Sequence, residues 1–133
     1  MKLLRFGNLG EEKPGILDKN GKIRDLSEII DDIDGETISP SSLDKIQKID
    51  FSKLPEVTVN PRIGPCVNNV GKFLCIGLNY SDHAAEVGAD IPSEPIMFMK
   101  ATSCIVGPND NIEIVSGSKK LDWEVELGIV IGK

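Results

Sequence analysis

The stretch Asp122-Trp123-Glu124-Val125-Glu126-Leu127-Gly128-Ile129-Val130-Ile131-Gly132 decides the expected fold, because its residues alternate in polarity. One alternation is apolar throughout and consists of Trp123, Val125, Leu127, Ile129 and Ile131. A period of two predicts a β-strand, in which residues two apart lie on the same face. Glu124 and Glu126 open the other face, where two like charges either meet solvent or share a cation. Mg²⁺ suits such a pair because it prefers oxygen ligands.

Composition excludes several classes of function for this 133-residue chain. Its net charge is −6, which disfavours binding to nucleic acid and to anionic lipid, since both need a basic surface. No stretch approaches transmembrane length, so no membrane association is expected. The three cysteines are odd in number and lack the C-x-x-C spacing of zinc sites, which favours a reducing, cytoplasmic location.

The first half of the chain predicts a small accessory domain. A strand is expected over residues 2–6, and a β-hairpin over 14–26, where Asn20-Gly21 favours a tight turn. Apolar residues at helical spacing predict a short helix over 28–33 and a second one over 39–49, which Pro40 can open.

Prolines punctuate residues 55–65 and favour extended backbone before each of them. Beyond this segment the sequence becomes richer in strands and glycines. We therefore expect residues 1–68 to form a small N-terminal α+β domain and residues 69–133 to form the first part of a second, β-rich, mixed-sheet domain. In the second domain, a buried strand is expected over 73–76, and the apolar run over 95–100 predicts another strand that a lysine ends.

Further strands are predicted on either side of the turn at 107–110, over residues 104–106 and 111–115. A very short helix is predicted between residues 79 and 88, directly after the strand at 73–76. Asn79 can cap this helix and Gly88 can end it. The end of a strand is a frequent position for functional groups.

His83, the only histidine, lies three residues before Glu86, so both side chains share one face of the short helix. A carboxylate beside an imidazole fixes its tautomer, and the pair can act as a general base toward water. The alternative is a surface ion pair without a catalytic role. Lys100 ends the strand at 95–100 and could neutralise an anionic substrate, or it could simply be a solvated charge.

Taken together, these strings resemble the fumarylacetoacetate hydrolase superfamily. The resemblance rests on the order and spacing of 61–65 (PRIGP), 76–86 (IGLNYSDHAAE), 95–100 (PIMFMK) and 122–127 (DWEVEL). The opening residues 1–7 and 13–18 are similar to the branch labelled 2,4-diketo-3-deoxy-L-fuconate hydrolase or ureidoglycolate lyase.

The resemblance implies a catalytic domain that holds a divalent metal, usually Mg²⁺ but also Mn²⁺ or Ca²⁺, on Glu124 and Glu126. It implies that His83 and Glu86 activate water and that Lys100 lies near a small keto or hydroxy acid substrate. It also implies a homodimer. Catalytic domains of the family continue further and carry a third metal-binding aspartate, for which this sequence has no counterpart, so a fragment is expected.

The implied reaction is the hydrolytic cleavage of a carbon–carbon bond in a 2,4-diketo, acylpyruvate-type acid. Two alternatives stay open at this point. The same site could instead serve a ureidoglycolate lyase or a keto-acid isomerase or decarboxylase. The chain could also be a non-catalytic fragment that lacks the rest of the active site.

Overall fold

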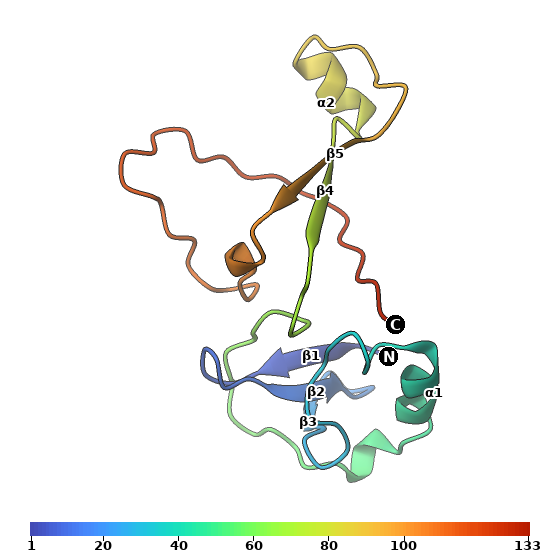
Figure 1. Cartoon of the computed structure of the whole chain (residues 1–133). Helices are drawn as coiled ribbons and strands as arrows, with labels where there is room; N and C mark the ends of the chain where they lie inside the picture. Colours follow the sequence, from blue (N-terminus) through green and yellow to red (C-terminus); the bar gives the residue numbers. More distant parts are fainter. The chain divides into compact units, whose positions relative to one another are not determined.

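The computed structural model describes all residues from Met1 to Lys133 and forms a small α+β fold with short helices and two antiparallel sheets (Figure 1). The α+β class expected from the sequence is confirmed. The chain divides into two compact units, of which the first comprises residues 1–69 and 106–133 and the second comprises residues 70–105. None of the helices has the length and apolar character needed to cross a membrane.

A three-stranded sheet organises the first unit. Its strands are β1 (Leu3–Phe6), β2 (Lys13–Leu17) and β3 (Ile23–Asp25), in the order β1-β2-β3. The expected hairpin is confirmed, and Asp18 fixes its turn, because Asp18 Oδ1 accepts the backbone N–H groups of Asn20 and Lys22. Gly21 in this turn has a φ of +77°, a conformation that favours glycine.

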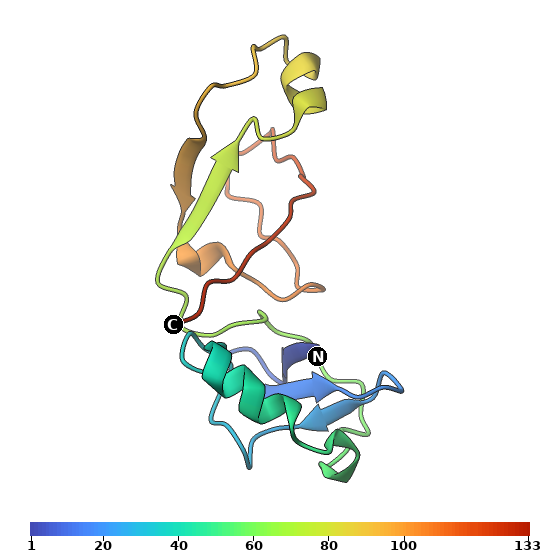
Figure 2. The same cartoon turned by 90° about the vertical axis from the view of Figure 1, so that its right-hand side faces the viewer.

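The core of the first unit lies between this sheet and helix α1 (Pro40–Gln47). Ile16 of β2, Leu26 and Ile46 of α1 are essentially inaccessible to solvent and pack in one cluster. Figures 1 and 2 show α1 beside the sheet. The predicted helix is confirmed, with Pro40 in its first turn. Burial of each such aliphatic side chain contributes about 1.5–3 kcal/mol of stability.

The helix predicted over residues 28–33 is wrong, because this segment forms only a turn in which Ile29 and Ile30 both donate to Leu26 O. The reason lies in Asp32. Its carboxylate accepts from the backbone of Ile33 and from side chains distant in sequence, so tertiary contacts fix a non-helical backbone. Six residues gain too little from helix formation to compete with such contacts.

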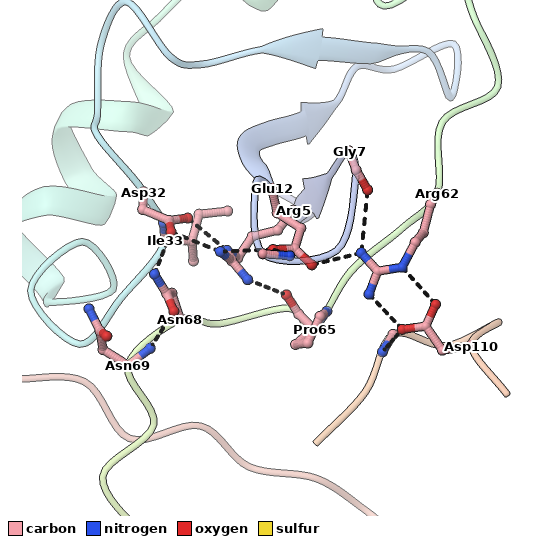
Figure 3. Close-up of polar contacts among 12 residues, drawn as sticks. Arg5, Gly7, Glu12, Asp32, Ile33, Arg62, Pro65, Asn68, Asn69 and Asp110 are labelled. Atoms are coloured by element: carbon pink, nitrogen blue, oxygen red, sulfur yellow. Dashed lines mark hydrogen bonds and ion pairs between the residues drawn. The ribbon is translucent and has the colours of Figure 1, made fainter. Parts of the chain in front are cut away.

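A chain of ion pairs fastens distant segments of the first unit together (Figure 3). Arg5 donates from Nε and Nη2 to the two carboxylate oxygens of Asp32 at 2.7 and 2.9 Å. Arg62 donates to Glu12 at 2.7 Å and to both oxygens of Asp110 at 2.7 and 2.6 Å. Arg5 Nη2 lies 3.7 Å from Glu12, which links the two arginines through one buried carboxylate. The network thus anchors the turn at 107–110 beside the sheet.

The second unit is a two-stranded antiparallel ribbon of β4 (Phe73–Gly77) and β5 (Ile96–Lys100), with helix α2 (Ser81–Glu86) between them. Both strands form as predicted, but the prediction that the strand at 73–76 is buried is wrong. Leu74 of β4 is 50% exposed, and every residue of β5 is exposed. An isolated two-stranded ribbon has no second layer that could cover its apolar side chains.

Residues 104–106, 111–115 and 122–131 do not form the strands predicted for them. A short 3-10 helix spans Thr102–Cys104 instead, and residues 119–133 have no regular structure. A separate 3-10 helix in the first unit spans Phe51–Lys53. A strand needs a neighbour that accepts and donates its backbone hydrogen bonds. No segment of this chain pairs with the alternating stretch, and Trp123 within it is 82% exposed.

Candidate functional site

Helix α2 carries the predicted general base. Tyr80 precedes the helix in extended conformation and takes the N-cap position that was expected for Asn79. Asp82 lies in the first turn, where the helix dipole favours a carboxylate. Gly88, which has a φ of +67°, follows the last turn, as predicted for the helix stop.

The helix brings His83 and Glu86 together. The Nδ1 atom of His83 lies 3.6 Å from Oε2 of Glu86, a separation too long for a hydrogen bond. Both side chains are accessible, since 48% of the His83 side chain and 80% of the Glu86 side chain face solvent. The predicted neighbourhood of the two groups is present, while their catalytic role remains a prediction.

A mostly apolar pocket of about 270 Å³, open to solvent, lies in the same unit. It is bounded by the end of β4 and by the loop that leads into β5, with lining residues Ile76, Gly77, Leu78, Asn79 and residues 91–95. Leu78 has a φ of +50°, which is unusual for a bulky side chain and costs about 1–3 kcal/mol. Neither His83 nor Glu86 lines this pocket.

Sequence reasoning missed this pocket and the backbone conformation of Leu78. No local signal distinguishes a leucine that will adopt positive φ, because the conformation is imposed by the surrounding turn. The prolines at 92 and 95 are the only sequence features that could have indicated a fixed loop at this position.

The predicted metal ligands Glu124 and Glu126 lie in the irregular, exposed stretch of the first unit. Their carboxylates are hard oxygen donors, so the donor type fits Mg²⁺, which would complete its coordination shell with water and substrate oxygens. No group of three or more histidine, cysteine, aspartate or glutamate side chains is arranged as a metal site. The assignment of these two residues to a metal remains a prediction.

Lys100 is the last residue of β5 and is exposed, as expected for a lysine at the end of a strand. It lies in the second unit together with His83 and Glu86, whereas the two glutamates of the acidic stretch belong to the first unit. The proposal that all five residues serve one site therefore rests on sequence.

Comparison with known proteins places these residues in a family context. Residues 72–133 match the family model described as fumarylacetoacetate (FAA) hydrolase C-terminal. This match supports the fumarylacetoacetate hydrolase superfamily. The finer branch within that superfamily is not shown by the match.

Relatives of the chain point in the same direction. The chain is 59% identical to a protein named "Putative hydrolase" from Burkholderia ambifaria, and 58% identical to proteins so named from Burkholderia orbicola and Burkholderia multivorans. Each comparison covers 132 residues, which are 99% of this chain and 47% of the relative. The chain thus spans about half the length of the curated relatives it matches.

Proposed function

We propose that this chain supplies part of the active site of a metal-dependent hydrolase that cleaves a carbon–carbon bond of a 2,4-diketo, acylpyruvate-type acid. The observation that carries the proposal is the family match over residues 72–133, because this range contains all five candidate site residues. The contact between His83 and Glu86 adds support, since water activation needs an oriented imidazole.

The proposed chemistry assigns one task to each side chain. Glu86 would accept the Nδ1–H of His83 once their 3.6 Å separation shortens to hydrogen-bond distance, which leaves Nε2 free to take a proton from water. The resulting hydroxide attacks the distal carbonyl carbon. The bond to the neighbouring carbon then breaks, its electron pair leaves with the pyruvate fragment, and that fragment takes up the proton. Lys100 pairs with the substrate carboxylate.

Glu124 and Glu126 would hold Mg²⁺ at the keto-acid end of the substrate. When bound, the ion supplies Lewis-acid polarisation of the keto acid. The contribution of the protein is to present two carboxylates on one side of an extended segment, which requires the strand conformation that the sequence predicts.

The test uses this chain joined to the remaining part of the Burkholderia ambifaria relative, so that the polypeptide has the full length of the family members. With an acylpyruvate and Mg²⁺, pyruvate release should be measurable. His83→Ala should lower kcat about 10²–10⁴-fold with a smaller change in KM. Asp90→Asn, an exposed loop carboxylate of the same unit, is the control. Equal turnover of the His83 and Asp90 variants would exclude the general-base role.

The metal assignment has its own readout. Glu124→Gln and Glu126→Gln should each reduce the Mn²⁺ bound per polypeptide, whereas Glu113→Gln, another exposed glutamate of the first unit, should not. A retained metal content in all three variants would contradict the assignment.

Within the superfamily we place the chain nearest the 2,4-diketo-3-deoxy-L-fuconate hydrolase or ureidoglycolate lyase branch, as a cytoplasmic homodimer. A panel that detects pyruvate, urea, CO₂ and keto–enol absorbance separates hydrolysis from lyase, decarboxylase and isomerase activity. Turnover of no member of the panel would favour the alternative of a non-catalytic fragment.

A further inference from the structure

The hairpin that joins β2 and β3 contains the only asparagine of the chain that precedes a glycine. Asn20 and Gly21 are both exposed, and the Asn20 side chain makes no hydrogen bond. The backbone nitrogen of the residue after an asparagine can attack the side-chain amide carbon, and a glycine has no Cβ that would obstruct the attack. This pair is therefore the point of the chain at which such a backbone reaction meets the least steric resistance.

Backbone hydrogen bonds of the turn hold the attacking nitrogen in place. Gly21 N donates to Asp18 O at 3.0 Å, and Asp18 N donates to Lys22 O at 2.9 Å, which closes a loop of three residues. Gly21 has a φ of +77°, as the last residue of a three-residue hairpin loop requires. Because Gly21 N is bound to Asp18 O, its attack on Asn20 has to wait until the turn opens.

The Asp18 carboxylate keeps this turn closed. Its Oδ1 atom accepts the backbone N–H groups of Asn20 at 2.8 Å and of Lys22 at 3.0 Å, and its Oδ2 atom accepts from Arg24 Nε at 2.9 Å. Only 6% of the Asp18 side chain is exposed, so water competes little for these bonds. One carboxylate shared by three donors therefore sets how often the turn opens.

The single Asp-Gly pair of the chain, Asp34-Gly35, is the other position at which the same ring could form. Asp34 Oδ1 accepts the backbone N–H groups of Glu36 and Thr37, both at 3.0 Å, so hydrogen bonds fix this side chain as they do not fix that of Asn20. A carboxylate is also a poorer electrophile than a neutral amide. Asn20 is therefore the preferred site.

We propose that Asn20 is a site of self-modification, which deamidates through a succinimide at a rate that Asp18 governs. Gly21 N loses its proton and forms a bond to Asn20 Cγ, the bond from Cγ to Nδ2 breaks, and ammonia leaves with a proton. Water then adds to either carbonyl group of the five-membered ring and opens it to aspartate or isoaspartate. Either product changes the net charge from −6 to −7, because a neutral amide becomes a carboxylate. The inference is independent of the proposed catalytic function.

The site is tested with the full chain, incubated in mildly alkaline buffer and analysed by peptide mapping and mass spectrometry. Isoaspartate is detected by methyl transfer from S-adenosylmethionine with an isoaspartyl methyltransferase. We expect Asn20 to convert about tenfold faster than Asn8, which is also exposed but precedes a leucine whose side chain hinders the attack. Asn20→Gln should abolish the signal at this position, since a six-membered ring forms less readily. Equal conversion of Asn20 and Asn8 would overturn the proposal.

The role of Asp18 has its own pair of variants. Asp18→Ala removes the side-chain acceptor and should speed conversion of Asn20 about tenfold, the factor expected when two hydrogen bonds of ordinary strength are lost. Asp18→Asn retains an acceptor oxygen and is the matched control, with a rate within about twofold of the unaltered chain. Amide exchange in β1 verifies that both variants are folded. An Asp18→Ala rate equal to that of the unaltered chain would contradict the assignment.

The same control of the rate is measurable without a substitution, which keeps the test valid if Asp18→Ala does not fold. Unfolding the unaltered chain in urea opens the turn in every molecule and should speed conversion of Asn20 about tenfold or more. Equal rates in the folded and the unfolded chain would show that the turn does not protect Asn20, and would overturn the proposal.

Discussion

Substitution of Asp32 by asparagine tests whether the chain of ion pairs holds the first unit together. Asp32 accepts four hydrogen bonds, two from Arg5 at 2.7 and 2.9 Å, one from Asn68 at 2.7 Å and one from the backbone of Ile33 at 2.7 Å. The asparagine has the same size, so the change removes the charge and one acceptor oxygen but creates no cavity.

The expected loss of stability follows from the burial of the pair. The Arg5 side chain is 7% exposed and that of Asp32 is 21% exposed, so the guanidinium would remain buried with Glu12, 3.7 Å away, as its only carboxylate neighbour. Removal of one partner of a buried pair costs about 3–5 kcal/mol. Because Asp32 is partly hydrated and Glu12 remains, we expect the lower end, about 3 kcal/mol.

Hydrogen–deuterium exchange of the amides in β1 and β2 reports on this unit specifically. At an m-value of about 2 kcal/mol/M, a loss of about 3 kcal/mol lowers the urea midpoint for exposure of these amides by about 1.5 M. Asp31→Asn is the matched control, because Asp31 is exposed and makes no side-chain hydrogen bond. If both variants unfold at the same urea concentration, the ion pairs do not stabilise the unit and the reasoning is refuted.

Two further predictions concern the same network. Burial alone would raise the pKa of Asp32, but the hydrogen bonds from Arg5 and from the backbone of Ile33 outweigh burial, so the pKa is lowered. The hydrogen bonds from Arg62 lower the pKa of Asp110 as well. A carboxylate whose pKa is lower in the folded state stabilises the fold at pH values above its unfolded-state pKa. The free energy of unfolding should therefore fall as the pH drops below about 5. A urea midpoint that stays constant between pH 7 and pH 3 would contradict this prediction. Gly107→Ala should loosen the turn at 107–110, because the added Cβ would collide with Ile63 O. Gly35→Ala is the control, because a Cβ at Gly35 meets open space. Equal amide protection in the two variants would contradict this prediction.

Local sequence signals predicted the elements whose cause is local. The hairpin around Asn20-Gly21 formed as expected because turn chemistry acts within a few residues. Helix α2 and the contact between His83 and Glu86 were likewise predictable from a spacing of three. The candidate base could therefore be located from the sequence.

The network of ion pairs could not be predicted, because its partners lie far apart in the chain. Arg5 and Asp32 are 27 residues apart, and Arg62 and Asp110 are 48 apart. Any of the 15 basic residues could in principle pair with any of the 21 acidic ones. The same distant contacts explain the failed helix prediction at 28–33, where Asp32 is bound to Arg5 and Asn68 instead of being solvated on a helix.

The failed strand prediction at 122–131 has a different cause. A period of two specifies which side chains share a face, but a strand forms only when a neighbouring edge is available. Glu124 and Glu126 lie on one face only while the backbone between them is extended. Any contact that holds this segment extended would therefore also set the geometry of the two carboxylates. By linkage, an interaction that stabilises the extended segment would favour the proposed cation site, and a bound cation would favour the extended segment to the same degree.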